Sequence, residues 1–411
     1  MIRAVLATRV VTCDPDRCTP DNPLGVIDNA AVLIENGDIA WIGERTDARV
    51  ASADVIEDCA LVTPALIDAH THAAWTGSRH DEYAVRMRGG DYVEIAAAGG
   101  GIAATQRSVA AASVDEISAT LEARLRRMAS LGVATVEIKS GYGLLPREEI
   151  KLLTAIAAAR ARADLPRVEA TYLALHAIPK SWTRGRDHYV ASAVALVDEI
   201  AERGLARFVD AYVDPHAFSV HEARKLGQAA LARGLGVRLH AGQFGDIGGA
   251  ELAAELGALS VDHLEHVSAR GIEALAGADV AACLLPVASF TLGQTPPPVA
   301  ALRKAGVRLV VASDANPGTA PTESLPLAIA LAVRNYGLSP AEALIAATRN
   351  AAVTLRGRAT GTLRNGGPAD LTSWDLPHET CIAQPWGTSR ARLVLRDGIA
   401  IANLQIRDRL A

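Results

Sequence analysis

The sequence predicts an α/β protein: a (β/α)8 TIM-like barrel with a small β-sandwich domain built from both chain termini. Eight short apolar segments alternate with helical patterns through the middle of the chain, and turn-separated apolar stretches occupy both ends. Near-continuous apolar runs are typical of parallel strands that are buried on both faces. Polar residues follow several of these segments, which places them at the end of a barrel where active sites lie. The 411 residues suffice for a large domain with a smaller one beside it.

Both ends of the chain show the pattern of short strands and hairpins. Near the start, the stretch AAVLIENGDIAWIG places Asn-Gly-Asp between two apolar runs, which is a hairpin signal. Near the end, ARLVLRDGIAIAN places Arg-Asp-Gly between two further runs. We therefore predict that residues 1–61 and 362–411 form one composite β-sandwich domain and that residues 62–361 form the barrel.

The middle of the chain supplies the barrel strands. A helical pattern that begins with a capping box, Ser113 and Glu116, lies between the first two of them. A doubly wound open sheet is the competing fold, but eight strand–helix alternations over about 300 residues favour the barrel. The eight segments are ALIDAH (65–70), VATVEIK (133–139), VEATYLALH (168–176), RFVDAYVD (207–214), GVRLHAG (236–242), LSVDHLEH (259–266), DVAACLLP (279–286) and RLVVASD (308–314).

Charge and cysteine usage exclude several classes of partner. The net charge is −5 and no basic run occurs, so we expect no nucleic-acid and no membrane-surface partner. The five cysteines are scattered without a CxxC pair, which argues against a zinc ribbon or a disulfide framework. Arg9 interrupts the first apolar stretch, and prolines interrupt the uncharged window 280–302, so neither is typical of a signal peptide or a membrane span. We expect a cytoplasmic protein.

Polar side chains with metal-binding chemistry end five of the eight predicted strands. A lone histidine in a loop is more often a surface group, but several at the same end of one barrel converge on one mouth. Two histidines spaced by one residue share a strand face, and imidazoles with a carboxylate suit Zn²⁺ or Fe²⁺. Such a metal lowers the pKa of bound water towards 7. The residues are His70 and His72 after the first strand, His176 after the third, His240 in the fifth, His263 in the sixth and Asp314 after the eighth.

At these residues the chain resembles the amidohydrolase superfamily, whose barrels carry a β-sandwich made from both termini. Longer strings narrow the resemblance to the imidazolonepropionase family of histidine degradation, in the same order over nearly the whole chain. They are GSRHDEYAVRMRGGDYVEIAAAGGGI, EIKSGYGL, ALHAIP, LHAGQ, VDHLEHV and SDANPGT. The resemblance implies hydrolysis of the ring amide C–N bond of 4-imidazolone-5-propanoate to N-formimidoyl-L-glutamate.

The resemblance also implies residue roles. It implies one divalent metal, Zn²⁺ or iron (Fe²⁺ or Fe³⁺), with Lys139 outside the ligand set, and a catalytic group of His263, Asp314 and Gln243. Some family members have Glu at the position of Gln243; since an amide cannot act as a general base, we assign Gln243 to orienting the substrate. The implied metal ligands are His70, His72, His240 and Asp314; the implied substrate contacts are Arg79, Tyr92, Tyr142, His176 and Gln243; the implied product contacts are Asn316, Gly318 and Thr319.

Structural alternatives stand beside these roles. Arg79 alone would be read as a surface ion-pair residue, and Tyr92 as a core residue at a helix start. Glycines on both sides of Tyr142 indicate a tight turn that lets the phenol project. The string DANPGT is typical of a turn that reverses the chain, and its groups could also bind a carboxylate.

Two other functions remain open at this stage. One is a deaminase or amidohydrolase that acts on another small cyclic amide or aromatic ring, although Gln243 stands where such deaminases usually carry Glu. The other is a barrel that binds a metabolite or partner without catalysis. The resemblance also suggests a homodimer, for which alanine-rich helices offer flat surfaces.

Overall fold

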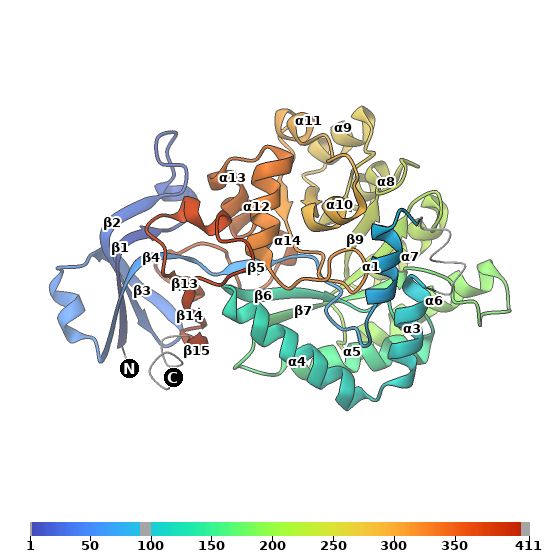
Figure 1. The fold of residues 1–411 in the computed structure, drawn as a ribbon, viewed down its shortest axis with the longest axis horizontal. Helices are drawn as coiled ribbons and strands as arrows, with labels where there is room; N and C mark the ends of the chain where they lie inside the picture. Colours follow the sequence, from blue (N-terminus) through green and yellow to red (C-terminus); the bar gives the residue numbers. More distant parts are fainter. Residues whose placement is uncertain (1, 91–99, 404–411) are drawn as a thin grey trace.

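Eight parallel strands form a barrel, which is the larger part of the computed structural model (Figure 1). The structure describes residues 2–90 and 100–403. The strands are hydrogen-bonded in chain order, and the first and last meet through a parallel bridge between Thr71 and Ala315. The barrel prediction is confirmed. The strands are β5 (Leu66–Asp68), β6 (Val133–Lys139), β7 (Arg167–Leu175), β8 (Phe208–Val213), β9 (Gly236–Ala241), β10 (Ser260–His263), β11 (Ala281–Leu284) and β12 (Leu309–Val311).

Helices cover the outside of the barrel. The helix predicted from the capping box is α4 (Val114–Ser130): the Ser113 side chain accepts from the Glu116 N–H, and the Glu116 carboxylate accepts from the Ser113 N–H at 2.8 Å. The other α-helices are α1 (His80–Met87), α3 (Ile102–Ala111), α5 (Pro146–Arg160), α6 (Arg186–Glu202), α7 (Val220–Ala232), α8 (Gly249–Leu256), α9 (Ala269–Gly277), α10 (Pro286–Leu292), α11 (Val299–Lys304), α12 (Leu325–Tyr336), α13 (Pro340–Ala346) and α14 (Arg349–Leu355). Short 3₁₀ turns are η1 (Pro15–Arg17), η2 (Ala48–Ser52) and η3 (Glu379–Ala383).

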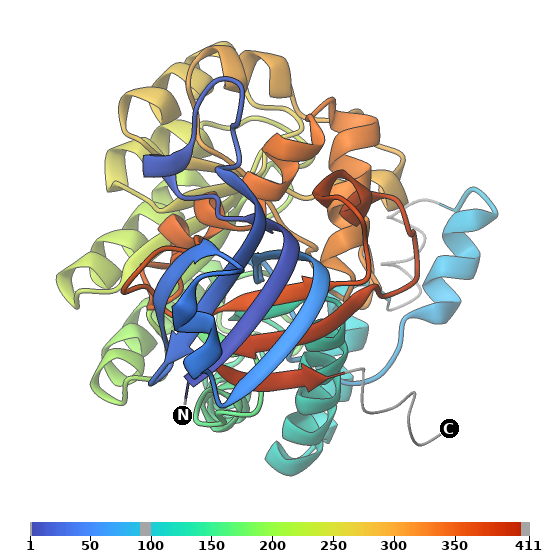
Figure 2. The same ribbon diagram turned by 90° about the vertical axis from the view of Figure 1, so that its left-hand side faces the viewer.

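A separate seven-stranded sheet contains segments from both ends of the chain, as predicted. In Figure 2 the blue N-terminal strands lie beside the red C-terminal ones. The sheet order is β15-β14-β13-β4-β1-β2-β3, with β4 parallel to β1 and antiparallel to β13. The strands are β1 (Ile2–Val11), β2 (Val26–Glu35), β3 (Asp38–Glu44), β4 (Val55–Pro64), β13 (Leu371–Trp374), β14 (Ala391–Arg396) and β15 (Ile399–Asn403).

Both predicted hairpin turns are present. Asn36 and Gly37 join β2 to β3, and Asp397 and Gly398 join β14 to β15; all four residues have positive φ, between 48° and 88°. Such turns match the twist of the flanking strands. The two turns touch, because the Ala369 N–H donates to the Gly37 carbonyl and the Gly398 N–H to the Ala369 carbonyl. The sheet thus curls around an apolar core of its own. The domain boundaries at residues 61/62 and 361/362 stay a prediction.

The second face of the sheet packs on the barrel. Trp374 of β13 is buried against Gly132, the residue before β6, where an added Cβ would lie 2.4 Å from the indole. Its indole N–H donates to the Thr63 hydroxyl at 2.9 Å. Arg167 at the start of β7 donates to Asp370 at 2.6 Å and to Asp397 at 2.8 Å. The sheet therefore packs on the barrel at the N-terminal ends of β6 and β7.

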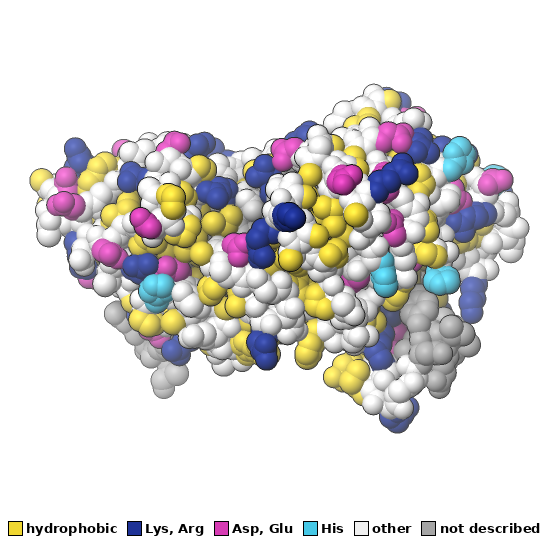
Figure 3. All heavy atoms as spheres, turned by 90° about the horizontal axis from the view of Figure 1, so that it is seen from above, with side chains coloured by type: hydrophobic (Ala, Val, Ile, Leu, Met, Phe, Trp, Pro, Cys, Tyr) yellow, Lys and Arg dark blue, Asp and Glu magenta, His cyan; other side chains and the backbone are white. Residues whose placement is uncertain are grey.

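The surface shows no area of a single charge sign on the face drawn in Figure 3, where basic and acidic side chains are interspersed. This agrees with the absence of a basic run in the sequence. Among the described helices, none combines the length and apolar character needed to cross a lipid bilayer.

Candidate active site

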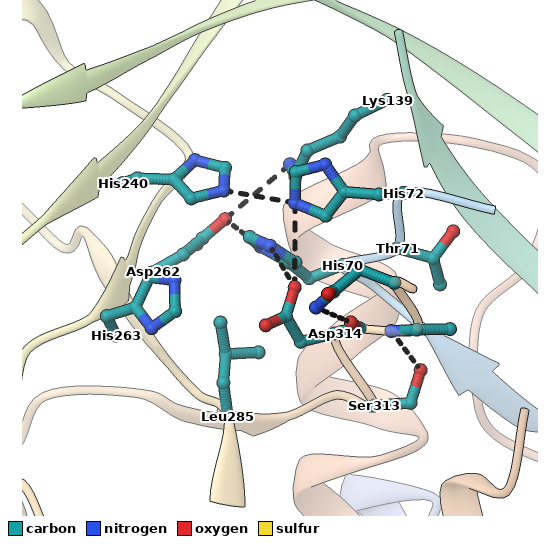
Figure 4. A network of polar contacts seen from close by, with 12 residues as sticks. His70, Thr71, His72, Lys139, His240, Asp262, His263, Leu285, Ser313 and Asp314 are labelled. Atoms are coloured by element: carbon teal, nitrogen blue, oxygen red, sulfur yellow. Dashed lines mark hydrogen bonds and ion pairs between the residues drawn. The ribbon is translucent and has the colours of Figure 1, made fainter. Parts of the chain in front are cut away.

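Four of the predicted metal ligands converge where the barrel strands end (Figure 4). His70 and His72 follow β5, His240 lies in β9 and Asp314 follows β12. The Asp314 Oδ1 atom lies 3.3 Å from His70 Nε2 and 3.5 Å from His72 Nε2, and His240 Nε2 lies 3.3 Å from His72 Nε2. Nitrogen and oxygen atoms from two loops and one strand therefore face one point.

The chemistry of this cluster fits a divalent cation. His70 Nε2 and Asp314 Oδ1 are buried and have no hydrogen-bond partner among residues 2–90 and 100–403. Burial lowers the pKa of His70 and of His72 well below the usual range, so both imidazoles are neutral and can ligate. Burial also raises the pKa of Asp314 to about 7, a cost that a cation beside the carboxylate would offset. The donor set suits zinc or iron.

Two further aspartates fix the orientation of the histidines. Asp262 accepts from His70 Nδ1 at 2.5 Å, and Asp210 accepts from His240 Nδ1 at 3.0 Å. Because each Nδ1 then carries the proton, each Nε2 presents its lone pair to the centre of the cluster. The sequence analysis did not single out either aspartate. Asp262 lies one residue and Asp210 three residues before the end of its strand, and both face the barrel interior, so strand alternation is the signal that could have found them.

Lys139 at the end of β6 lies among carboxylates rather than among ligands. Its Nζ atom is 2.9 Å from Asp210, 3.0 Å from Glu137 and 3.7 Å from Asp262. Although burial opposes its charge, Asp210 and Glu137 raise the pKa of Lys139 above its usual range. The side chain is therefore an ammonium, which agrees with the prediction that Lys139 does not ligate a metal.

A pocket opens beside the cluster, and most of the predicted site residues line it. His70 is completely buried behind it, and Gly318 lies against Arg79 but is not part of the wall of this pocket. Tyr92 lies outside the described residues. The predicted residues on the wall are His72, Arg79, Tyr142, His176, His240, Gln243, His263, Asp314, Asn316 and Thr319; the wall also contains Arg86, Ile102, Tyr212, Phe244 and Leu292, which the sequence analysis did not single out.

Two guanidinium groups lie at one side of the pocket. Arg79 donates through Nε at 2.8 Å to Glu82, whose other oxygen accepts from the Gly101 N–H. Arg86 donates at 3.0 Å to the carbonyl of Gly318. Gly318 leaves room for Arg79, because an added Cβ would lie 2.2 Å from its Nη1 atom. Spacings of three, four and seven residues on one helix face connect Arg79, Glu82 and Arg86, and this periodicity was the signal that was missed.

Aromatic rings form another part of the pocket wall. Tyr142 is buried, with its ring centroid 5.6 Å from that of His72 and 5.4 Å from that of His176. Gly141 before it has φ +96°, so the tight turn that was predicted is present. His176 Nδ1 donates to the Gly141 carbonyl at 2.7 Å, which leaves its Nε2 as an acceptor.

Gln243 is held by its neighbours at both ends. The Tyr212 hydroxyl donates to the Gln243 side-chain oxygen at 2.7 Å, and the Gln294 side-chain amide donates to the Gln243 carbonyl at 2.8 Å. The Gln243 amide nitrogen is thus the group left to meet a ligand. Tyr212 shares a strand face with Asp210, two residues earlier, and that alternation could have indicated it.

The DANPGT loop is shaped by Asn316. Its side-chain oxygen accepts from the N–H groups of Gly318 and Thr319, both at 2.8 Å, and its amide donates to the Asp314 carbonyl at 2.7 Å. Both readings of this loop, chain reversal and product site, stay compatible with this geometry.

His263 completes the site: its ring centroid lies 5.5 Å from that of His240, close enough for His263 to share a metal with His70 and His240.

Comparison with known proteins gives a consistent result. Residues 61–399 match the model of the amidohydrolase family. The imidazolonepropionase of Maricaulis maris is 44% identical over 369 residues, which are 89% of this chain and 91% of that protein. The imidazolonepropionase of Geobacillus kaustophilus is 40% identical over 391 residues, 92% of each chain.

A solved structure extends the likeness in fold. An adenosine deaminase from Xanthomonas campestris with bound zinc superposes with a TM-score of 0.71 at 18% identity, over 99% of this chain and 98% of that one. The barrel and the sheet from both termini agree with this likeness in fold. The chain belongs to the amidohydrolase family and, within it, to the imidazolonepropionases.

Proposed function

We propose that this protein hydrolyses the ring amide C–N bond of 4-imidazolone-5-propanoate to N-formimidoyl-L-glutamate, a step of histidine degradation. The observation that carries the proposal is the buried cluster beside a pocket that Arg79 lines; in this cluster His70 Nε2 and Asp314 Oδ1 make no hydrogen bond among the described residues. Identities of 40–44% to imidazolonepropionases over about 90% of the chain support the choice of substrate.

One metal ion, zinc or iron, would be held by His70, His72, His240 and Asp314. When bound, such an ion lowers the pKa of a water molecule and polarises a carbonyl group. Zinc is the ion in the structurally similar adenosine deaminase. Lys139 neutralises the nearby carboxylates of Asp210 and Glu137, so we propose a single ion.

The propionate tail would meet the guanidinium side of the pocket. Arg79 and Arg86 carry two positive charges and Glu82 one negative charge, so this group has a net charge of +1 that one carboxylate balances. The ring would lie between this group and the metal cluster, along Tyr142 and His176, with Gln243 donating to it. Tyr92 belongs to the same proposed contacts on sequence grounds.

The reaction adds the oxygen of water to the ring carbonyl carbon and breaks the bond from that carbon to the ring nitrogen. One proton of the water leaves to a base, and the departing nitrogen takes up a proton. His263 and Asp314 are the groups on the pocket wall that can hold and move these protons. The product carries a second carboxylate, and we assign Asn316, Gly318 and Thr319 to product binding.

The experiment follows the ultraviolet absorbance of freshly made 4-imidazolone-5-propanoate with the purified, metal-loaded protein. We expect turnover by the wild type and a rise of KM in Arg79→Ala, with no turnover of guanine. If the protein binds the metal but does not turn over the imidazolone, the proposed substrate is wrong. The alternative is then another amidohydrolase or deaminase activity. The location in the cytoplasm and the pairing of two copies are further proposals that rest on the sequence pattern and the resemblance alone.

A further inference from the structure

A buried glutamate lies directly behind His263. Two consecutive residues with positive φ, His263 at 84° and Leu264 at 74°, end β10 and turn the chain back, so that Glu265 faces the histidine. Such backbone angles are unfavourable for residues other than glycine and are maintained where the surrounding structure enforces them. The turn therefore costs conformational free energy, and it brings the Glu265 carboxylate close to the His263 imidazole.

The facing atoms of this pair have no other partner. Glu265 Oε2 lies 3.9 Å from His263 Nδ1. Both atoms are buried and make no hydrogen bond within the part of the chain that the structure describes. An unpaired buried carboxylate oxygen and an unpaired ring nitrogen each cost free energy, and a small closure between them satisfies both. Hydrogen bonds in catalytic groups are often long until substrate binds.

The other oxygen of Glu265 is held by two hydroxyl groups. Ser289 of α10 donates to Glu265 Oε1, and the Ser289 hydroxyl lies 2.6 Å from that of Tyr336 at the end of α12. With Tyr336 donating to Ser289 and Ser289 donating to Glu265, every hydroxyl proton points towards the carboxylate. This favours its ionised form, which can only accept from His263 Nδ1–H.

We infer that Glu265 is a positioning residue: by accepting from Nδ1–H of His263 it keeps His263 Nε2 unprotonated and turned to the pocket as the proton acceptor for hydrolysis. The inference rests on the proposed function, in which Gln243 cannot take that proton. His263 lies beside His240 and Asp262 at the edge of the cluster, where such an acceptor is needed (Figure 4). Burial raises the pKa of Glu265 to about 7, so its charge depends on the donors around it.

Replacement by the amide is the sharpest variant. In Glu265→Gln, the oxygen keeps the Ser289 hydroxyl and the amide nitrogen donates to His263 Nδ1, which places the ring proton on Nε2. The analogous exchange in a serine protease triad lowers kcat by about 10⁴ with the geometry intact. We expect kcat to fall by about 100-fold or more, a general base being worth about 10² to 10⁴, with KM nearly unchanged. Ser289→Ala should give a smaller loss of kcat.

Glu379→Gln is the matched control, because Glu379 is equally buried, 9% exposed, and pairs with Arg9 away from the barrel mouth. It should leave kcat unchanged. The second readout is the tautomer of His263, observed by nuclear magnetic resonance of ¹⁵N-histidine in the zinc-loaded protein and assigned with His263→Asn. We expect Nδ1–H in the wild type and Nε2–H in Glu265→Gln.

Nε2–H in the wild type, or an unchanged kcat in Glu265→Gln, would overturn the inference. A wild type that does not turn over 4-imidazolone-5-propanoate would instead refute the proposed substrate. In that case the tautomer readout still decides the role of Glu265, so the two failures are distinguishable.

Discussion

Several charges inside the barrel are compensated by a neighbouring charge, whereas that of Asp314 is not. Lys139 lies against Asp210 and Glu137, and the Arg238 guanidinium lies 3.8 Å from Asp262. Asp314, in contrast, touches histidines that burial keeps neutral. Since an uncompensated buried carboxylate is costly, Asp314 is where the structure requires an added cation.

Asp210→Asn should weaken metal binding. The neutral amide is a weaker acceptor for His240 Nδ1–H than the carboxylate, so His240 loses its fixed orientation. Lys139 keeps its contacts with the carboxylates of Glu137 and Asp262. We expect metal affinity to fall by about 10- to 100-fold. Competition with a chromophoric chelator measures it, with the melting temperature as a check of folding. If Asp210→Asn binds the metal as tightly as the wild type, Asp210 does not support metal binding.

Gly318→Ala should weaken substrate binding without unfolding the protein. The added methyl group displaces the Arg79 guanidinium, which is the end of a flexible side chain, so stability changes little. A charge-assisted hydrogen bond is worth about 1.5–3 kcal/mol, so KM should rise by about tenfold or more. Gly277→Ala is the control, because an added Cβ there meets nothing within 4 Å. Equal KM values for the two variants would contradict the placement of the tail beside Arg79.

The sequence could predict which three histidines and which aspartate come together, but not all of the groups that support them. His70, His72, His240 and Asp314 stand directly at strand ends, and a strand end can be read from an apolar run. Helix spacing and strand alternation indicate Glu82 and Tyr212, but the contact of Glu265 with His263 depends on a backbone turn with positive φ. Such contacts depend on tertiary geometry that a residue pattern does not specify.

Two loops at the barrel mouth are each fixed by a buried side chain of an outer helix. Arg124 of α4 stacks on Trp75 with its Cζ atom 3.4 Å from the ring centroid, and donates to the Ala73 and Trp75 carbonyls. Glu149 of α5 accepts from the N–H groups of Gly141 and Leu144. Helices outside the barrel thus fix the loops that carry the site. Strand and helix positions followed from the sequence, whereas these anchors did not.

Glu222→Gln should destabilise the start of α7. Glu222 completes a capping box with Ser219 and accepts from Arg186 at 2.6 Å. The Arg186 hydrogen bond lowers the pKa of Glu222 from 4.5 to about 2. Because the pKa of Glu222 is lower in the folded chain than in the unfolded chain, its charge stabilises the fold at pH values above the unfolded-state pKa. This stabilisation is lost as the pH falls from about 4.5 to about 2.

Urea unfolding at two pH values checks the effect. At pH 7 we expect the variant to be about 1 kcal/mol less stable than the wild type, the usual worth of a helix cap. At pH 3 the difference should shrink. A difference that is the same at both pH values would show that the Glu222 charge does not stabilise the helix.

At the scale of the whole molecule, the barrel-facing side of the terminal sheet shares an apolar cluster with the barrel. Trp374, Leu61 and Val394 of the sheet pack in the same cluster as Leu66 and Val133 of the barrel. The composite domain could be predicted because both ends show hairpin patterns. The order of its strands could not, since the pairing of β4 with both β1 and β13 depends on where the barrel brings the two ends together.

Trp374→Ala should destabilise the whole chain. A large cavity would form between Gly132 and the sheet, and such replacements cost about 3–5 kcal/mol. Because the core is shared, we expect scanning calorimetry to show one transition at a lower temperature. A separate low-temperature transition, with the barrel transition unmoved, would show that the sheet folds independently.

Product identification in ¹⁸O-labelled water is the most direct test of ring hydrolysis at this site. We expect mass spectrometry to show N-formimidoyl-L-glutamate with one ¹⁸O atom, in the carboxylate that was the ring carbonyl, and no release of ammonia. Unchanged 4-imidazolone-5-propanoate, or ammonia as a product, would contradict hydrolysis of the ring amide bond.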